Sequence, residues 1–314
     1  MLAYTLRRLA ATIPVLLVVA LLVFLMLRLV PGDPAAVLAG DAANAEQIAR
    51  VRASLGLERS IVEQFGLWLG RHAQGDLGES FYFKVKVSEL IAQRLEPSVA
   101  LAVLTLAIAV SLALPLGALA AWRSGGALDR LLMALSVLGF SVPVFVLAYS
   151  LIWLVSLKLG WLPVQGYARL ADGGWPFLRH LILPALSLAT IHLALLARVT
   201  RAALIEALGE DYIRTARAKG LGELRVLLRH ALANAALPIV TTIGTSIGLL
   251  IGGVVVTESV YAIPGLGRLT VDAVLARDFP TIQGLILFFA LLHIAINLLV
   301  DLSYVFLDPR VRYA

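Results

Sequence analysis

The residues of this 314-residue chain that could do chemistry are five histidines and a few polar groups in apolar surroundings. The histidines are far apart, and none forms the His-x-x-x-His spacing typical of zinc or nickel sites. A nucleophilic mechanism needs a serine beside a histidine, for which Ser187 with His192 or Ser246 with His293 are conceivable pairs. No signature motif accompanies either pair. We predict no catalytic residue and no metal site, and keep a hydrolase as the alternative class.

Four polar residues stand inside, or near the edges of, long apolar stretches: His192, His293, Asn297 and Asp301. Ionisable groups are costly in hydrocarbon and usually face the interior of the protein. Asp301 lies near the end of its stretch, which favours a structural arginine partner over a role in substrate binding. These four are the candidates for intramembrane polar groups.

The apolar stretches that would position these residues dominate the sequence. Hydrophobic residues make up 60% of the chain and charged residues 15%, and the charges gather between apolar runs. Each run has about twenty residues, the length that a helix needs to cross roughly 30 Å of hydrocarbon. We predict an all-α polytopic membrane protein with six spans: Leu9–Val30, Val99–Ala121, Leu131–Leu157, Leu181–Ala203, Leu237–Val256 and Ile282–Val300.

Several predicted spans contain proline, namely Pro14, Pro115, Pro143 and Pro184. Neighbouring helices in a membrane can satisfy the backbone groups that proline frees, so these prolines predict kinks and not breaks. The first span follows a pair of arginines, but its apolar run is longer than a signal-peptide core and no small-residue cleavage site follows. It is expected to be an uncleaved anchor.

Orientation follows from the positions of lysine and arginine near the spans. With the N-terminus in the cytoplasm, the inner segments hold thirteen of these residues, Arg310 and Arg312 included, whereas the two short outer loops hold five. Both termini are therefore expected to be cytoplasmic. The net charge of +6 is a topology signal on this interpretation, because no patch interleaves basic and aromatic residues as nucleic-acid binding would require.

Three segments follow from this topology. Residues 1–30 form the N-terminal end and first span, residues 31–96 an extracytoplasmic segment, and residues 97–314 a core with a large cytoplasmic loop at about 204–236. The segment 31–96 is too polar to span, but apolar residues at helical spacing predict short amphipathic helices there, with Ile48, Val51 and Leu55 in one and Ile61, Phe65 and Leu69 in another.

The cytoplasmic loop contains the basic stretch "EDYIRTARAKGLGELRVLLRHALANAALP", residues 210–238. Gly209 predicts the end of one helix, and the acidic pair after it the start of another. Gly220 and Gly222 suit a turn with positive φ. The expected product is a helix, a glycine turn and a helix, with one apolar face formed by Ile213, Ala216, Gly220, Leu224, Leu227 and Ala231.

Two physical interpretations fit such an element. It could lie on anionic lipid, for which basic residues beside a span suffice. It could instead dock into a groove of a soluble partner.

The same stretch resembles the EAA loop of ABC-transporter permeases, whose coupling helix docks in a cleft of the ATPase. In that family the pattern is Glu-Ala-Ala, three residues, Gly, nine residues, then Ile-x-Leu-Pro. Arg214, Thr215 and Ala216 take the Glu-Ala-Ala places, Gly220 the glycine and Leu232 the leucine. The sequence departs from the pattern where Arg214 replaces the glutamate, His230 the isoleucine and Ala233 the proline.

Other motifs resemble the dipeptide, oligopeptide, nickel and glutathione branch of these permeases, in order along essentially the whole chain. They include the opening "LRRLAATIPVLLVVALLVFLMLRLVPGDPA", "GDLGES" at 75–80, "GFSVPVF" at 139–145, "GWLPVQG" at 160–166, "GGVVVTESVYAIPGLGRLTVDAVLARDFPTIQG" at 252–284 and "NLLVDLSYVFLDPRVR" at 297–312. Single motifs such as GDLG are weak, whereas the ordered series is specific to the branch.

The resemblance implies a type I ABC importer permease in the bacterial inner membrane, which binds no cofactor itself. Its implied partners are a second homologous permease, two ATP-binding subunits that hold ATP and Mg²⁺, an extracytoplasmic solute-binding protein and membrane lipid, with no nucleic acid. Dipeptides or short oligopeptides are the expected cargo, with glutathione or nickel complexes as alternatives. The implied ATPase-coupling residues are Arg214, Thr215, Ala216, Arg217, Lys219, Gly220, Leu221 and Gly222.

The turn "IPGLGR" at the outer end of the fifth predicted span is a second candidate site. Pro264, Gly265 and Gly267 mark tight turns, with Glu258 upstream. In the family this segment lines the outer gate region, and the alternative is a turn-rich connector. The chain has no P-loop, so ATP hydrolysis is assigned to a separate subunit. It also lacks a channel filter sequence and the paired internal symmetry of a secondary transporter.

Overall fold

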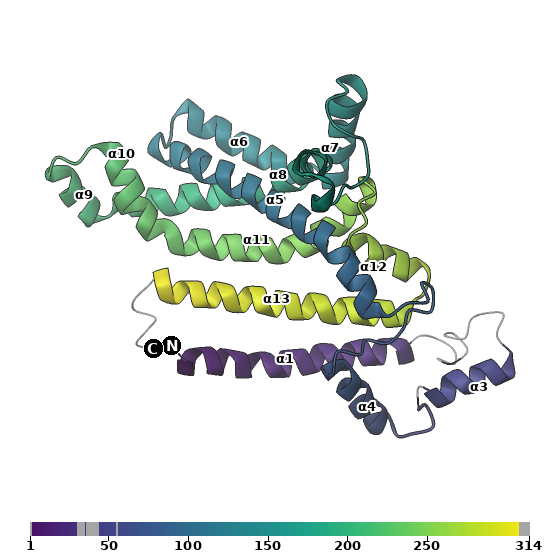
Figure 1. The fold of residues 1–314 in the computed structure, drawn as a ribbon. Helices are drawn as coiled ribbons and strands as arrows, with labels where there is room; N and C mark the ends of the chain where they lie inside the picture. The colour runs from purple at the N-terminus through teal and green to yellow at the C-terminus, as the bar shows by residue number, and fades with distance from the viewer. Residues whose placement is uncertain (1, 30–34, 36–43, 55, 308–314) are drawn as a thin grey trace. The chain divides into compact units, whose positions relative to one another are not determined.

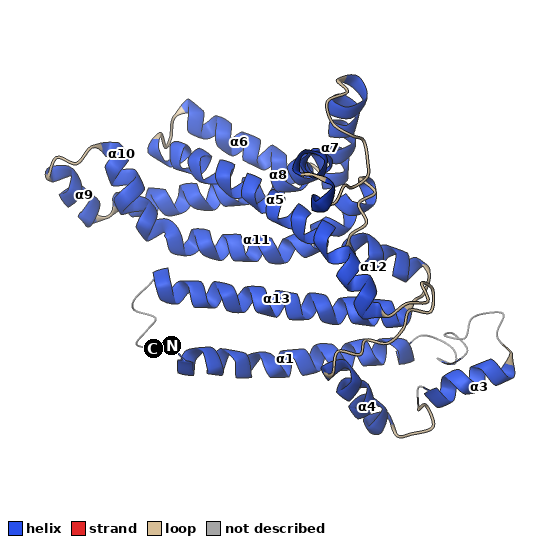
Figure 2. Cartoon of the chain, viewed as in Figure 1, coloured by secondary structure: helices blue, strands red, loops and turns tan. Residues whose placement is uncertain are grey.

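The computed structural model describes residues 2–29, 35, 44–54 and 56–307, and helices dominate throughout (Figure 2). Within these ranges no strand forms, and Glu79 and Lys86 make an isolated antiparallel bridge. The predicted all-helical class is confirmed. The long helices are α1 (Leu2–Leu29), α5 (Val87–Trp122), α6 (Ala127–Ser141), α8 (Gly174–Gly209), α11 (Leu232–Val260) and α13 (Phe279–Leu307). The shorter ones are α3 (Ala45–Ser54), α4 (Ile61–Ala73), α7 (Val144–Leu151), α9 (Asp211–Ala218), α10 (Glu223–Arg225) and α12 (Leu266–Leu275).

Five helical stretches of the described chain are long and apolar enough to cross a membrane, and a bent pair makes a sixth. They are Ala10–Leu29, Val87–Trp122, Gly174–Gly209, Glu223–Val260 and Phe279–Ser303, with Ala127–Ser141 and Val144–Lys158 as the pair. Each overlaps one predicted span. All but the first exceed the predictions at their ends, because helical backbone continues through polar residues that hydropathy does not count.

The prediction that Pro143 only kinks its span is wrong. Helix α6 ends at Ser141, Val142 is extended at φ −82° and ψ 124°, and α7 starts after Pro143 at an angle of 99°. Proline disfavours helical backbone in the residue before it and removes an N–H, and here both effects end the helix. Pro14, Pro115 and Pro184, in contrast, lie inside continuous helices.

The chain divides into two compact units, residues 1–95 with 268–295, and residues 96–267 with 296–314. In the first unit α4 packs on α1 through an aromatic cluster, in which the Phe24 ring lies 5.2 Å from Phe65 and 5.7 Å from Trp68. Ser60 and Glu63 form a capping box that starts α4. Ile61, predicted on the apolar face, is 53% exposed, because the side that meets α1 is centred on Phe65 and Trp68.

The other predicted amphipathic helix corresponds to α3, which contains Ile48 and Val51. Leu55 lies outside the described residues, as do Arg310 and Arg312.

A buried carboxylate explains the GDLGES motif of the first unit. Asp278, 1% exposed, accepts hydrogen bonds from Ser80 Oγ at 2.5 Å, the Phe81 N–H at 3.1 Å and Thr281 Oγ1 at 2.6 Å. Gly78 has φ +82°, which lets the motif turn back toward this group. Three donors satisfy a carboxylate that would otherwise be costly to bury.

In the second unit α8 is the central helix and contacts α6, α7 and α11 (Figure 1). Fourteen of its side chains are buried, most of them leucine or alanine. Helix α5 approaches it closely at Gly117, where a Cβ would lie 2.7 Å from the carbonyl oxygen of Ala197. Small residues allow such close packing of membrane helices.

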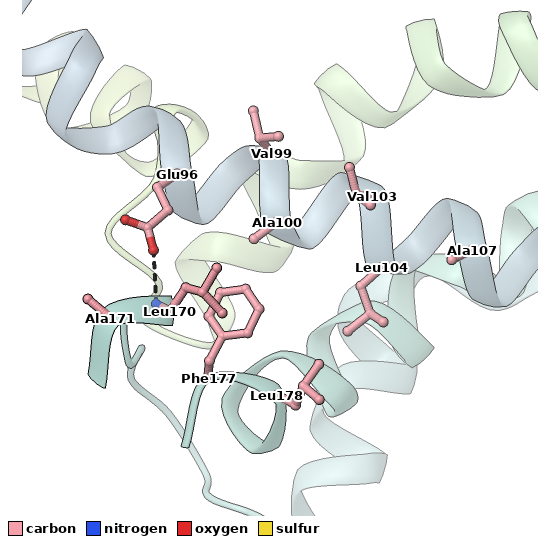
Figure 3. A pocket seen from close by; sticks show the side chains of 10 residues that line it. All are labelled: Glu96, Val99, Ala100, Val103, Leu104, Ala107, Leu170, Ala171, Phe177 and Leu178. Atoms are coloured by element: carbon pink, nitrogen blue, oxygen red, sulfur yellow. Dashed lines mark hydrogen bonds between the residues drawn. The ribbon is translucent and has the colours of Figure 1, made fainter. Parts of the chain in front are cut away.

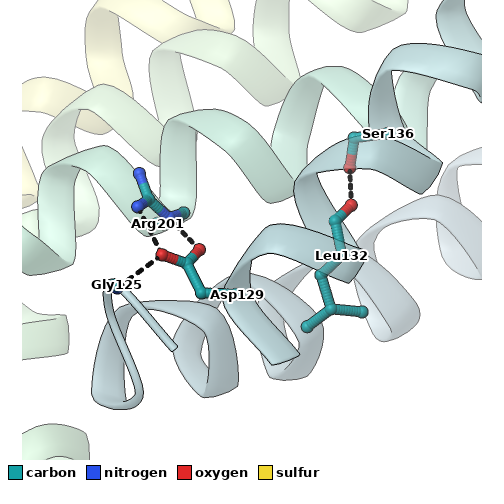
Figure 4. A network of polar contacts seen from close by, with 5 residues as sticks. All are labelled: Gly125, Asp129, Leu132, Ser136 and Arg201. Atoms are coloured by element: carbon teal, nitrogen blue, oxygen red, sulfur yellow. Dashed lines mark hydrogen bonds and ion pairs between the residues drawn. The ribbon is translucent and has the colours of Figure 1, made fainter. Parts of the chain in front are cut away.

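One ion pair joins α6 to α8 in this unit (Figure 4). The Asp129 carboxylate receives Arg201 Nε at 2.5 Å and Nη2 at 2.7 Å, and also the Gly125 N–H at 2.9 Å. Asp129 is 3% exposed. The bidentate geometry and the extra backbone donor satisfy the buried carboxylate and fix the α5–α6 turn against α8.

Candidate functional site

The basic loop, defined here as residues 210–231, forms the predicted helix, turn and helix (Figure 1). Helix α8 ends at Gly209, Glu210 precedes α9, and Asp211 lies in the first turn of α9. Helix α10 then continues through a wide π-helical turn, η3 (Val226–Ala231), into α11. The loop is thus continuous with two long spans, and a displacement of the loop would be transmitted to both.

The turn depends on one glycine and not two. Gly220 has φ +79°, and its N–H bonds to the Arg217 carbonyl at 2.9 Å. Gly222, expected to share this conformation, has φ −64° and is instead the N-cap of α10. A single left-handed residue suffices because Lys219, the C-cap of α9, already turns the chain out of the helix at ψ 5°.

The inner face of the loop is anchored in a hydrophobic cluster. Ile213 and Ala216 of α9 are buried at 0% and 6% exposure and pack in one cluster with Val226, Leu227 and Ala231. The prediction fails for Leu224, which is 62% exposed. The turn at Gly220 and the wide turn η3 interrupt the helical register, so a period counted across them does not apply to Leu224.

The outer face of the loop carries the candidate coupling residues. Arg214, Thr215, Arg217 and Lys219 are exposed, as are Gly220 and Gly222, while Leu221 is partly buried. Arg214 pairs with Asp211 at 3.2 Å, and Arg217 makes two bonds to the Glu223 carboxylate at 2.8 and 3.1 Å. Hydrogen bonding to Glu223 raises the pKa of Arg217. This pair closes the turn from α9 to α10, so the loop offers a preshaped basic surface.

The outer-turn candidates lie together around a buried carboxylate. Glu258 is 0% exposed and receives Ser98 Oγ at 2.5 Å, while Ser98 Oγ accepts the Leu266 N–H at 2.7 Å. The Ile263 N–H bonds to the Glu258 carbonyl at 2.9 Å. Gly265 lies directly against the Glu258 carboxylate, leaving no room for a Cβ, and a Cβ on Gly267 would lie 2.6 Å from the Val255 Cα. The glycines are required because the turn closes over Glu258.

Replacing Gly265 with alanine is expected to destabilise this turn, because the new Cβ would overlap the Glu258 carboxylate. Overpacking of a tight site typically costs about 1–3 kcal/mol. We expect faster proteolysis of the Gly265→Ala transporter at the outer turn. The control is Gly252→Ala in α11, where a Cβ meets nothing within 4 Å. Equal protease resistance of the two variants would contradict close packing at Gly265.

Two residues that the sequence did not single out hold this turn in place. Tyr261, 2% exposed, shares a hydrogen bond of 2.8 Å with Ser187 of α8 and donates to the Ala148 carbonyl of α7 at 3.3 Å. Ser98 of α5 binds both Glu258 and Leu266. No sequence signal marks these residues, since their partners are distant along the chain.

The four intramembrane candidates are not brought together. His192 is 3% exposed in α8, and its Nδ1 has no hydrogen-bond partner in the described structure. His293 and Asn297 are exposed on α13, contrary to the expectation that such groups face the interior, while Asp301 is partly exposed and has an interaction of its own. Residues four apart on a helix share a face, so His293 and Asn297 form a polar stripe that a single chain leaves open.

Neither serine–histidine pair forms. Ser187 Oγ bonds to the Leu183 carbonyl at 2.9 Å and to Tyr261, and Ser246 Oγ has no partner within the described ranges. Over those same ranges, no group of three or more histidine, aspartate or glutamate side chains could hold a metal ion.

A large cavity of about 780 Å³ lies between α5 and the start of α8 (Figure 3). Its walls are apolar except for Glu96, whose Oε1 accepts the Tyr167 hydroxyl at 3.0 Å and the Leu170 N–H at 3.1 Å. Burial, followed by the bond to Glu96, raises the pKa of Tyr167. This carboxylate fastens the loop before α8, and the cavity presents little else for polar chemistry.

Comparison with known proteins gives two family matches. The model described as "Binding-protein-dependent transport system inner membrane component" matches residues 113–313, and the corresponding N-terminal model matches residues 1–102. A probable peptide ABC transporter permease of Sinorhizobium fredii is 48% identical over 99% of both chains. The glutathione transport system permease protein GsiC of Salmonella paratyphi A is 46% identical over 100% of both chains.

The fold also matches a solved structure. A chain of the inward-facing MetNI methionine ABC transporter superposes with a TM-score of 0.58 at 18% identity, covering 70% of this chain and 96% of that one. This likeness supports the type I importer permease fold.

Proposed function

This chain belongs to the family of binding-protein-dependent transport system inner membrane components and is the permease of an ABC importer, and from that premise we propose that its cargo is dipeptides or short oligopeptides. The observation that carries this proposal is the full-length identity of 48% to a probable peptide permease. The protein is a multi-pass membrane protein and not an enzyme. Its family implies a complex with an ATPase and a binding protein.

The finer arrangement is part of the proposal. One copy of this chain pairs with a second, homologous permease in the inner membrane, with both termini cytoplasmic, and two ATP-binding subunits bind ATP and Mg²⁺ below. The translocation path runs between the two permeases. The exposed stripe of His293 and Asn297 supports this, because polar groups on an open helix face are costly in lipid and are satisfied where a partner covers them.

The basic loop is proposed to dock on the ATP-binding subunit. Its proposed contact residues are Arg214, Thr215, Arg217, Lys219, Gly220, Leu221 and Gly222, and the eighth coupling candidate, Ala216, supports this surface from the buried inner face. The buried cluster under Ile213 supports this role, because a loop packed against its own spans transmits a push that a loosely held loop would absorb. The outer turn, with Glu258, Pro264, Gly265 and Gly267, is proposed as part of the outer gate.

Glutathione is the second candidate cargo, favoured by the 46% identity to a glutathione permease. Nickel complexes are the third.

The test is uptake of labelled dipeptide, glutathione and nickel in cells lacking the gene, and in the same cells with the gene restored. We expect dipeptide uptake to fall on deletion and to recover on restoration. Recovery of glutathione or nickel uptake alone would replace the peptide assignment, and no change in any of the three would refute all three cargo assignments.

A further inference from the structure

A second cavity, of about 360 Å³, lies in the first unit, and charged and polar side chains form much of its lining, unlike that of the apolar cavity. It is lined by parts of α1 and α4, Ala53 near the end of α3, the turn before α4, residues 76–79 with Phe81, and the start of α13. Three arginines line it: Arg28, Arg59 and Arg71. Cavities of this size commonly hold a small molecule or one end of a longer one.

Arg28 is held in place by neutral groups only. Its guanidinium lies 3.6 Å from the centre of the Phe24 ring and donates to the Phe24 carbonyl at 3.0 Å and to Gln64 Oε1. Gln64 is 9% exposed, and its amide nitrogen donates to the Arg59 carbonyl at 2.9 Å. The buried glutamine thus fixes both Arg28 and the turn that carries Arg59. Arg28 keeps its positive charge, with N–H donors to spare.

Arg59 and Arg71 stand at the exposed rim of the same cavity. Among the described residues, no ion pair forms to any of the three arginines. The lining also contains two carboxylates, Asp76 and Glu79. Asp76 accepts the Gly78 N–H at 3.0 Å. The ends of α1 and α4 favour cations through their helix dipoles, since Arg28 and Arg71 lie in the last turns. That effect does not explain why three arginines converge on one cavity.

His72 adds a hydrogen-bond acceptor to this cavity, whereas the arginines supply donors. Its Nδ1 lies 2.9 Å from the Trp68 carbonyl, so Nδ1 carries the proton and Nε2 is an acceptor. Burial lowers the pKa of His72, which favours this neutral form. The Nε2 atom is buried and has no partner within the described chain. An acceptor beside a cationic cavity suits a ligand whose N–H lies next to its anionic group.

We propose that this cavity binds the terminal carboxylate of a peptide, with the three arginines as its cationic donors and His72 Nε2 as the acceptor for the adjacent amide N–H. Guanidinium groups bind carboxylates in planar, charge-assisted geometry. The inference rests on the proposed peptide cargo. It places a cargo contact in the segment before α5 together with the end of α1 and the start of α13.

The first test is arginine footprinting of the complete transporter in nanodiscs with phenylglyoxal, read residue by residue by mass spectrometry. The probes are a dipeptide, the same dipeptide amidated at its C-terminus, glutathione, and the binding protein without cargo. We expect the free dipeptide to slow modification of Arg59 and Arg71 severalfold and the amide to have no effect. Arg50, 71% exposed on α3 and paired with Glu46 at 3.4 Å outside the cavity, serves as the internal control.

The second test is dipeptide uptake by the Arg71→Gln transporter, whose side chain has no bonding partner to lose in the described structure. Loss of one charge-assisted hydrogen bond should raise KM about tenfold with little change in Vmax. Arg50→Gln should leave both unchanged, and Arg28→Gln should repeat the KM effect if that variant folds.

The outcomes separate this inference from the cargo assignment. Protection by glutathione in a transporter that does not import dipeptides would refute the peptide cargo and keep the carboxylate site. Protection by the empty binding protein alone would show that a protein side chain supplies the carboxylate, and would overturn the proposal. No protection by any probe would overturn it as well, whatever the uptake assay shows.

Discussion

Replacing Gly220 with valine is expected to abolish uptake while the transporter still assembles in the membrane. Gly220 has φ +79°, a conformation that costs a β-branched residue about 1–3 kcal/mol. The chain would relieve this strain by reopening the turn between α9 and α10, which displaces Arg217 from Glu223 and changes the surface that meets the ATPase. We expect uptake to fall at least tenfold, with ATP hydrolysis no longer stimulated by loaded binding protein.

Gly222→Val provides a matched control two residues away. Gly222 is also exposed and a Cβ there meets nothing within 4 Å, but its φ of −64° suits any residue. Valine at Gly222 adds similar bulk to the same proposed contact surface without backbone strain, so it should retain more of the uptake than valine at Gly220. Loss in both variants would mean that bulk on the docking surface matters and not backbone conformation. Normal uptake in Gly220→Val would refute the docking role.

Breaking the Asp129–Arg201 pair is expected to cause the largest loss of stability. Arg201→Met leaves the Asp129 carboxylate buried with the Gly125 N–H as its remaining donor. Removing one partner of a buried ion pair typically costs about 3–5 kcal/mol. The measurement is the free energy of unfolding of the purified permease in mixed micelles under SDS titration.

Two variants test that explanation of the cost. Arg201→Met combined with Asp129→Leu removes both charges and should recover most of the stability, because an apolar pair can replace a buried ion pair at little cost. Arg123→Met removes an exposed arginine from the neighbouring turn and should change stability by less than about 0.5 kcal/mol. If the double variant is as unstable as Arg201→Met, the loss comes from packing and not from an unpaired charge.

The sequence was sufficient for features that depend on local composition. Apolar runs of span length predicted the place of each candidate span in the described chain, because a membrane leaves the backbone few alternatives to a helix. Gly220 was found from its residue type and its place between two amphipathic stretches. Gly222 shows the limit, since glycine permits a positive φ without requiring it.

The sequence was insufficient for features that depend on distant partners. Ser80 and Asp278 are 198 residues apart, and Ser98 and Glu258 are 160 apart. No periodicity relates such positions. Pro143 shows the same limit for backbone shape, because its residue type does not distinguish it from Pro184, which stays inside a continuous helix. Only the packing around each proline decides between a kink and a break.

The wide turn η3 has a consequence for how the loop is aimed. A π-helical turn is equivalent to one extra residue within a regular helix. Here it forms the last part of the basic loop, directly before α11. Deleting one residue from Val226–Ala231 would rotate everything before it by about 100° around the axis of α11. The orientation of the loop around the axis of α11 therefore depends on the number of residues in this turn and not on the identity of its side chains. Inserting or deleting one residue in η3 would turn the preceding part of the loop toward an ATPase cleft of different orientation. Substitutions that leave the number of residues unchanged would not rotate the loop in this way.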